Sequence, residues 1–348
     1  MTEIQEGFMP FGKYQTYYRI VGQPSEKAPL LLLHGGPGST HNYFEMLDSL
    51  AQKDQRQLIM YDQIGCGQSS MPADPSIYNR DTWVKELIAL RDYLHLDRIH
   101  LLGQSWGGML AIIYMCDQMP AGVKSVILAS TLSDSQLWGK EQHRMIKALD
   151  STEQAAIRQA ETSGDYQSPE YKRANAHYML LHCADEVSRD SPECLRREKK
   201  AGTVAYNAAW GPNEYTPIGN LRDYNYTAKL RHMYTPTLIT SGTNDLCTPL
   251  VAKTMADALP NAKWHLFAGT RHMSFVEKPH EYKNLLMNWL NSHDWFIMSI
   301  RHEKALPKKG SIIWAKPTCN ASWCLHTPAI PEITGDMTMV GRWQCAYS

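Results

Sequence analysis

Six short apolar runs, separated by longer stretches, restrict the fold of this sequence more than any other feature. Runs that are apolar without interruption predict strands buried on both faces, as in a sheet covered by helices. One intervening stretch, residues 82–94, places Trp83, Leu87 and Leu90 on one stripe of a helix. Strands that alternate with helices indicate a mostly parallel α/β sheet. The six runs comprise residues 29–34, 57–62, 98–103, 125–130, 237–242 and 264–267.

The alternation of strand and helix stops between residues 131 and 234, where helical patterns follow one another and no strand is predicted. Asp150, with Glu153 three residues later, is typical of a helix start. We therefore expect an α/β core of residues 1–130 and 235–292, with an inserted helical cap of residues 131–234. Such a cap would lie over the sheet edge at which α/β proteins bind ligands.

Both ends of the chain depart from this pattern. Residues 17–23 predict an early antiparallel strand. The C-terminal extension, residues 293–348, has four Trp and three Cys without sustained periodicity, which is compatible with a small binding module. We expect instead a poorly ordered extension, because chain ends without packing signals are commonly loose.

Charge and composition exclude several classes of function. The 348 residues include 35 Lys and Arg against 35 Asp and Glu, so we expect no nucleic-acid partner and no anionic-membrane partner. No apolar run approaches the ~18 residues of a membrane span, and the N-terminus lacks the pattern of a secretory signal. The eight cysteines lack the spacing of a metal site, which predicts free thiols in the cytoplasm and no bound metal.

The sequence G-Q-S-W-G at residues 103–107 joins a predicted strand to a predicted helix. A serine nucleophile must project from a sharp strand-to-helix turn, where bulky residues two positions to either side would clash. Ser105 is therefore a candidate nucleophile. The same pattern also fits an ordinary turn that needs glycine for a positive φ, so other residues have to decide.

A serine nucleophile needs a base and an orienting acid, which in α/β hydrolases follow it in the order Ser, Asp or Glu, His. Asp245 follows the fifth apolar run, and His272 follows the sixth. Each has a structural alternative, since Asp245 could cap the helix near Pro249 and His272 could be an ordinary loop histidine. Because both fall at the required strand ends and in the required order, we predict a triad of Ser105, Asp245 and His272.

Acyl transfer also needs two backbone N–H groups that stabilise the oxyanion. One should come from Trp106, directly after the nucleophile, where the start of a helix adds a favourable dipole. The other should come from the loop after the first apolar run, H-G-G-P-G-S-T, in which we select Gly36. A phosphate-binding loop is the competing interpretation, but the G-K-[ST] element is missing.

Five segments, in this order, resemble the proline iminopeptidases (prolyl aminopeptidases) of the α/β-hydrolase superfamily. They are LLLHGGPGSTHNYF, MYDQIGCGQSS, LLGQSWGGMLAIIY, WGPNEYTPIGN and TSGTNDLCTP, and the resemblance covers about residues 5–292. It implies an α/β-hydrolase fold with an inserted helical cap. It also implies release of an N-terminal residue, preferably proline, from short peptides with a free amino terminus, without metal or cofactor.

The resemblance further implies a substrate-binding role for Glu214, because a cap glutamate in the segment WGPNEY recognises the substrate ammonium in this family. A carboxylate meets that need by a charge-assisted hydrogen bond. Some members carry a second glutamate after the catalytic Asp, where this chain has Leu246. Selectivity between peptides and amino-acid amides therefore stays open. The alternatives are an L-amino-acid amidase or arylamidase with the same triad and a non-catalytic small-ligand receptor; an epoxide or haloalkane hydrolase would need Asp at position 105.

Overall fold

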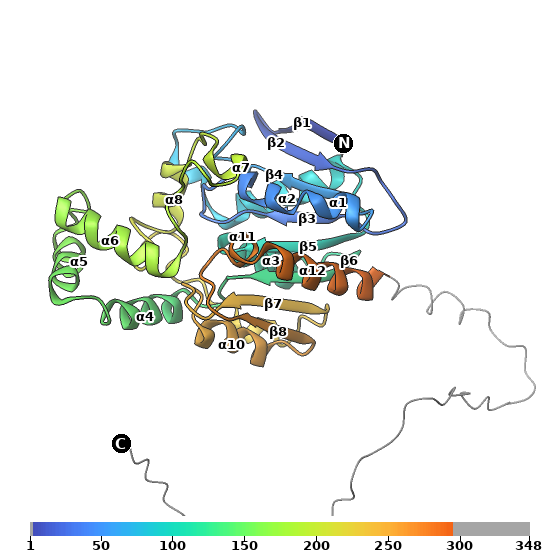
Figure 1. Cartoon of the computed structure of the whole chain (residues 1–348). Coiled ribbons are helices and arrows are strands. Elements are labelled where there is room, and N and C mark those ends of the chain that lie inside the picture. The colour runs from blue at the N-terminus through green and yellow to red at the C-terminus, as the bar shows by residue number, and fades with distance from the viewer. Residues whose placement is uncertain (1–2, 295–348) are drawn as a thin grey trace, which may run out of the picture. The chain divides into compact units, whose positions relative to one another are not determined.

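A central eight-stranded sheet organises the computed structural model, which describes residues 3–294 of the chain (Figure 1). The strand order is β1-β2-β4-β3-β5-β6-β7-β8. Strands β3 to β8 are parallel to one another, whereas β2 pairs antiparallel with both β1 and β4. The predicted, mostly parallel α/β-hydrolase sheet is thus confirmed. The strands are β1 Ile4–Phe11, β2 Tyr14–Val21, β3 Leu30–Leu33, β4 Leu58–Tyr61, β5 Ile99–Gln104, β6 Val123–Ala129, β7 Thr237–Gly242 and β8 Ala262–Phe267.

The two edges of the sheet differ most from the sequence-based expectation. Strand β1 was not predicted, and it lies at an edge with most of its residues exposed. Residues 264–267 do lie in a strand, β8, but the prediction that this strand is buried is wrong for all of them but Phe267. The reason is that β8 is the other edge strand, so its side chains have a neighbouring strand on one side only.

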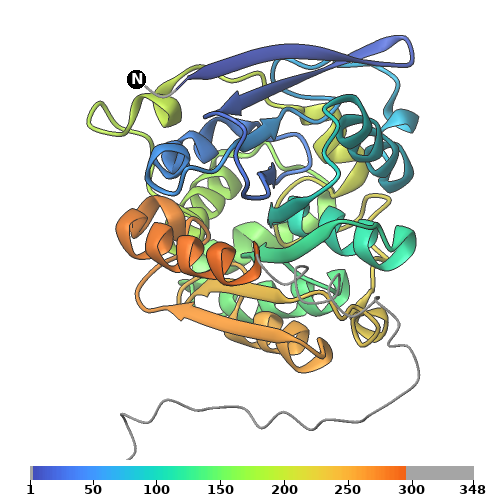
Figure 2. The same cartoon turned by 90° about the vertical axis from the view of Figure 1, so that its right-hand side faces the viewer.

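Helices cover both faces of the sheet, as Figure 2 shows. Alternate residues of β3 separate accordingly, since Leu31 and Leu33 pack in one apolar cluster and Leu30 and Leu32 in the other. The first cluster includes side chains of α2, α3 and α10, and the second includes those of η1, α1 and α12. The described helices outside the segment between β6 and β7 are η1 His41–Leu47, α1 Ser49–Lys53, η2 Pro75–Ile77, α2 Arg80–Tyr93, α3 Trp106–Ile113, η3 Tyr114–Gln118, α10 Pro249–Ala258, α11 Ser274–Glu277 and α12 Pro279–Asp294.

Six helices lie in the chain between β6 and β7, in the stretch that we predicted to be a helical cap. Asp150 closes a capping box with Glu153 at the start of α5, as its sequence predicts. In this part of the described chain the only β-type pairing is an isolated bridge between Asp134 and Asn225. Helices α4, α5, α6 and α8 lie together to one side of the sheet in Figure 1. The six are α4 Ser135–Ile146, α5 Ser151–Ser163, α6 Pro169–His182, α7 Glu193–Arg196, α8 Thr203–Ala209 and α9 Thr227–Leu230.

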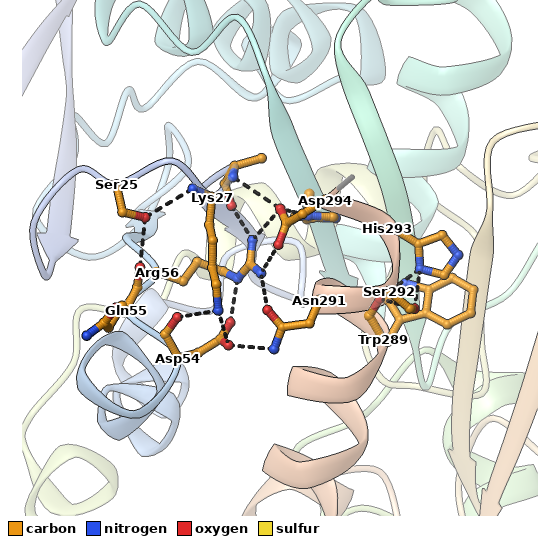
Figure 3. Close-up of polar contacts among 12 residues, drawn as sticks. Ser25, Lys27, Asp54, Gln55, Arg56, Trp289, Asn291, Ser292, His293 and Asp294 are labelled. Atoms are coloured by element: carbon orange, nitrogen blue, oxygen red, sulfur yellow. Dashed lines mark hydrogen bonds and ion pairs between the residues drawn. The ribbon is translucent and has the colours of Figure 1, made fainter. Parts of the chain in front are cut away.

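A buried ion cluster fixes the end of α12 against the core (Figure 3). Arg56 pairs with Asp294 at 2.6 Å between Nη2 and Oδ2, and with Asp54 at 2.8 Å between Nε and Oδ2. Asp294 also accepts a hydrogen bond from His100 Nε2 at 3.0 Å. Helix α12 reaches Asp294, two residues beyond the core boundary predicted at residue 292, and Asp294 belongs to the core through these contacts. The C-terminal extension predicted from residue 293 lies otherwise outside the described residues.

Candidate active site

Ser105 occupies the sharp turn between β5 and α3, with φ 53° and ψ −123°. This positive φ is uncommon for a residue other than glycine, and such backbone strain is characteristic of functional sites. The flanking glycines are required by space. A Cβ on Gly103 would clash with the carbonyl of Gly107, and a Cβ on Gly107 would clash with the carbonyl of Leu33. The G-x-S-x-G pattern thus lets the start of α3 pack closely against β5 and against the end of β3, with a serine at the tip of the turn.

Asp245 and His272 follow β7 and β8 and meet at one end of the sheet. His272 Nδ1 lies 2.7 Å from Asp245 Oδ1. The same carboxylate accepts hydrogen bonds from Ser130 Oγ at 2.6 Å and from the backbone N–H groups of Gly242 at 3.0 Å and Cys247 at 2.8 Å. Because a carboxylate can only accept these bonds, His272 carries its proton on Nδ1 and leaves Nε2 free to accept one.

The charge of His272 is governed by opposing influences. Burial disfavours the imidazolium, but the charge and hydrogen bond of Asp245 and the charge of Glu214 favour it, and the net effect raises the pKa of His272. Ser105 and His272 line the same cavity. Among the described residues there is no hydrogen bond between Ser105 Oγ and His272 Nε2. Such contacts are often long in an enzyme without substrate and shorten when substrate binds.

The backbone N–H groups of Gly36 and Trp106 have no acceptor within residues 3–294. Trp106 is the first residue of α3, so its N–H lies at the positive end of the helix dipole. The loop that carries Gly36 passes close to the nucleophile, because a Cβ on Gly35 would lie 3.0 Å from Ser105 Cβ. Gly36 itself has a φ of 112°, which favours glycine. Both predicted oxyanion donors therefore lie on segments that adjoin Ser105, and neither has an acceptor among the described residues. Their role in binding an oxyanion stays a prediction.

A cavity of about 530 Å³ lies between the sheet and the inserted helices. Glu214 lines it together with Ser105 and His272, and it supplies the only carboxylate among the described lining residues. Its Oε1 accepts a hydrogen bond from Tyr206 at 2.8 Å, and its carbonyl accepts one from Trp138 Nε1 at 2.7 Å. Burial raises the pKa of Glu214, and this is partly offset by His272 and by the Tyr206 hydrogen bond. The structure thus places the carboxyl group of Glu214 in the cavity that Ser105 and His272 also line.

Leu246 is fully buried and lies outside the described lining of this cavity. Its carbonyl accepts a hydrogen bond from Gln142 Nε2 at 2.7 Å, so the residue joins the core to α4. The absence of a second glutamate at this position therefore leaves Glu214 as the single acidic group of the described site.

Several lining residues were not predicted from the sequence. Tyr206 and Pro212 come from the inserted segment, and Tyr43 and Met273 come from the core. Tyr43 and Pro212 lie in segments that carry the family resemblance, and Met273 is next to His272, whereas Tyr206 had no such signal. Cys183 also lines the cavity, whereas Cys247, two residues from Asp245, is fully buried. The thiol exposed to substrate is thus Cys183.

Two further features of residues 3–294 concern possible metal ligands and the character of the helices. In residues 3–294, no group of three or more His, Cys, Asp and Glu side chains is arranged to hold a metal ion. The cysteines of this part of the chain that are placed are free thiols: Cys66, Cys116, Cys183, Cys194 and Cys247. None of the described helices combines the length and the apolar character needed to cross a membrane.

Comparisons with known proteins agree with this geometry. Residues 28–279 match the family model described as the alpha/beta hydrolase fold. Proline iminopeptidase of Lactobacillus helveticus strain DPC 4571 is 64% identical over 293 residues, which cover 84% of this chain and 99% of that protein. The corresponding protein of Lactobacillus crispatus strain ST1 is 61% identical over 293 residues, covering 84% and 100%. The crystal structure of proline iminopeptidase from Mycobacterium smegmatis superposes with a TM-score of 0.75 at 30% identity, covering 83% of this chain and 99% of that one.

Proposed function

This chain belongs to the proline iminopeptidase family of the α/β hydrolases, and we propose that it is a serine aminopeptidase that releases N-terminal proline from short peptides. One observation supports this proposal above the others. The carboxylate of Glu214 lines the same cavity as Ser105 and His272. An exopeptidase needs such a pairing, because it must recognise a terminal ammonium beside the bond that it cleaves.

In the proposed reaction Ser105 Oγ attacks the carbonyl carbon of the first residue while His272 Nε2 takes the hydroxyl proton. The negative oxygen of the tetrahedral intermediate accepts hydrogen bonds from the N–H groups of Gly36 and Trp106. His272 then gives its proton to the leaving amine as the C–N bond breaks. Water attacks the acyl-enzyme in the same way, and the free amino acid and Ser105 are released. Asp245 keeps the imidazole in the required tautomer throughout.

Glu214 supplies the specificity for a free amino terminus in this proposal. The protonated amine of an N-terminal proline donates to the carboxylate, and its positive charge in turn favours the ionised form of Glu214. Apolar and aromatic side chains beside Glu214, including Tyr206 and Pro212, offer contacts to the pyrrolidine ring. A blocked amine would bring a bulky neutral group against a buried carboxylate, so an N-acylated substrate should be rejected.

An L-amino-acid amidase or arylamidase with the same triad is the second candidate function. It is favoured by one observation, namely that Glu214 is the only carboxylate in the described lining and that Leu246 replaces the second glutamate of some relatives. A single acidic group fixes the amine less firmly, which leaves small amides as acceptable substrates. The cytoplasmic location expected from the cysteine pattern also stays a prediction.

Substrate comparison separates these proposals. We expect wild type to hydrolyse proline p-nitroanilide and to hydrolyse N-acetylproline p-nitroanilide at least about tenfold to a hundredfold less efficiently, which is the range for a hydrogen bond to a charged group. A higher kcat/KM on Pro-Gly than on proline amide supports the peptidase, and the reverse supports the amidase. Equal rates on free and acetylated substrates would contradict amine recognition. A folded protein that binds proline but turns over none of these substrates would be a receptor.

A further inference from the structure

Gln63 joins the two segments that carry the predicted oxyanion donors, although it is neither a member of the predicted triad nor one of the described residues that line the cavity. It is the second residue after β4 and is 1% exposed. Its Nε2 donates to the carbonyl of His34 at 2.9 Å, and its Oε1 accepts from Trp106 Nε1 at 2.7 Å. One neutral side chain thus spans from the loop that leads to Gly36 to the first residue of α3.

The backbone of Gln63 strengthens the same connection. Its N–H donates to His34 Nε2 at 2.9 Å, so that nitrogen carries no proton. The proton of His34 therefore lies on Nδ1, which donates to the carbonyl of Gly35 at 2.9 Å. Burial lowers the pKa of His34 to about 4, and this tautomer persists at neutral pH. The chain of bonds runs without a break from Trp106 through Gln63 and His34 to the residue before Gly36.

Two donors stabilise an oxyanion only if they converge on one point, because a hydrogen bond weakens steeply when its length or angle is wrong. The backbone on each side of this site is held by steric limits at its glycines, and β3 and β5 pair as far as Leu33 and Gly103. Beyond these paired residues, Tyr43 links the N–H of Gly35 to the side chain of Gln104, and Gln63 links His34 to Trp106. Gln63 is thus the side chain that connects the loop of Gly36 directly to the residue whose N–H is the second donor. We propose that Gln63 is a positioning residue that sets the separation between the Gly36 and Trp106 N–H groups. The inference rests on the proposed function, since it assigns these two groups to acyl transfer.

The amide of Gln63 cannot be replaced by related side chains without loss. Glutamate could accept from Trp106, but an ionised carboxylate could not donate to the His34 carbonyl. Methionine would fill a similar volume and make neither bond. Each change should let the two donors drift apart, which weakens binding of a tetrahedral oxyanion and leaves binding of a planar or non-electrophilic ligand almost unchanged.

The experiment compares wild type, Gln63→Met and Gln63→Glu with two ligands and two substrates. Pyrrolidine-2-boronic acid forms a tetrahedral adduct with the serine and places an oxygen between the donors, whereas L-prolinol occupies the cavity without forming one. We expect kcat on proline p-nitroanilide and affinity for the boronic acid to fall together by about tenfold to a hundredfold, somewhat less than full removal of a donor. Affinity for prolinol should stay within about threefold, the ordinary scatter of such comparisons.

Ser125→Ala is the matched control. Ser125 Oγ accepts from the indole of Trp289 at 3.0 Å, so its removal also leaves a buried indole N–H without its acceptor. Ser125 pairs with His100 near the start of β5, whereas Ser105 follows the other end of that strand. This variant should lose stability but keep kcat and the boronic-acid affinity of wild type.

A second pair of variants keeps the test decisive if Gln63→Met does not fold. Trp106→Phe retains the backbone N–H and removes the indole donor together with part of a buried ring. Its loss in kcat should overlap with that of Gln63→Glu. The double variant should therefore lose less than the product of the single losses. Three results would each overturn the positioning role. The first is a double variant whose loss in kcat equals the product of the single losses. The others are an unchanged affinity for the boronic acid and an equal fall in affinity for the boronic acid and for prolinol.

The substrates also separate this inference from the proposed function. Turnover of p-nitrophenyl acetate by Ser105 uses the same oxyanion donors but needs no amine. A wild type that cleaves this ester and not proline p-nitroanilide would overturn the aminopeptidase proposal. In that case the positioning role is tested with the ester. Gln63→Met should lower kcat on the ester, and its thermal stability takes the place of prolinol binding as the check that the fold is intact.

Discussion

Replacing Asp294 should destabilise the whole core, although this residue lies close to the end of the described chain. Arg56, which is 0% exposed, pairs with two carboxylates, those of Asp54 and Asp294. Lys27 pairs with Asp54 at 2.7 Å, so two positive and two negative charges balance in the cluster (Figure 3). Asp294→Ala leaves the positive charges of Arg56 and Lys27 with a single carboxylate, that of Asp54, so the cluster has one positive charge in excess.

The magnitude follows from the burial of the pair. Breaking a buried ion pair by removing one partner costs about 3–5 kcal/mol, and the remaining Asp54 contact places Arg56 at the low end, about 3 kcal/mol. Asp294 also accepts from His100 Nε2 and from the backbone N–H of Ala28. Those donors also lose their acceptor in Asp294→Ala, so the cost in stability should not be smaller than this. For a domain of this size, about 3 kcal/mol corresponds to a fall in Tm of roughly 5 °C.

Urea unfolding of Asp294→Ala and Asp294→Asn measures this loss, and Asp257→Asn is the control. Asp257 pairs with Lys253 at the surface, with both side chains more than half exposed, so that change should cost at most about 1 kcal/mol. Equal costs for Asp294→Ala and Asp257→Asn would refute the reasoning. A chain that ends at residue 296 should match the full chain, whereas one that ends at residue 292 should show the loss.

The pH dependence of the stability of Asp294→Asn, compared with wild type, provides a second test of the cluster. Burial alone would raise the pKa of Asp294, but the hydrogen bonds from His100 and Arg56 and the charge of Arg56 outweigh it and hold the pKa well below its ordinary range. A carboxyl with a depressed pKa stabilises the fold above its unfolded pKa and loses that contribution as pH falls through its folded pKa. The stability difference between wild type and Asp294→Asn should therefore persist at neutral pH and narrow only below about pH 4.

Three further predictions concern the site. Ser105→Ala should keep the unfolding midpoint and lower kcat on proline p-nitroanilide by roughly 10⁶; activity within about tenfold of wild type would contradict the triad. An organomercurial should inhibit wild type and Cys247→Ser alike but spare Cys183→Ser, because Cys183 lines the cavity and Cys247 is buried with its thiol donating to a carbonyl. The acidic limb of kcat/KM should reflect His272, and Glu214→Gln should move its midpoint to lower pH, because the charge of Glu214 contributes to the raised pKa of His272; a shift to higher pH would refute that coupling.

The parts of this protein that obey local rules could be predicted from its sequence. Buried parallel strands read as continuous apolar runs, so β3 to β7 were found within about three residues. The order of Ser105, Asp245 and His272 predicted that they lie at one edge of the sheet, because parallel strands bring their carboxyl ends together there. Asp245 contacts His272, and Ser105 and His272 line the same cavity, while the catalytic role of the three stays a prediction. Glycine spacing around Ser105 was informative because each missing side chain corresponds to a clash.

The parts that depend on distant pairing could not be predicted. Arg56 and Asp294 are 238 residues apart, and neither lies in a pattern that predicts a partner. Gln63 follows a strand end like many polar residues, and only the fold reveals that it contacts both His34 and Trp106. The burial of the edge strand β8 was predicted wrongly for a related reason, since an apolar run in the sequence does not show how many strands will lie beside it.

Selective loss of activity in Glu214→Gln tests the central claim most directly. The change removes the charge and nearly keeps the shape, so kcat/KM on proline p-nitroanilide should fall about tenfold to a hundredfold, as expected for a hydrogen bond worth about 1.5–3 kcal/mol. Turnover of p-nitrophenyl acetate, which has no amine, should stay close to wild type, and Glu170→Gln, an exposed acid on α6, should change neither rate. Equal loss on both substrates would assign Glu214 a structural role, and no loss on either would contradict amine recognition by this residue.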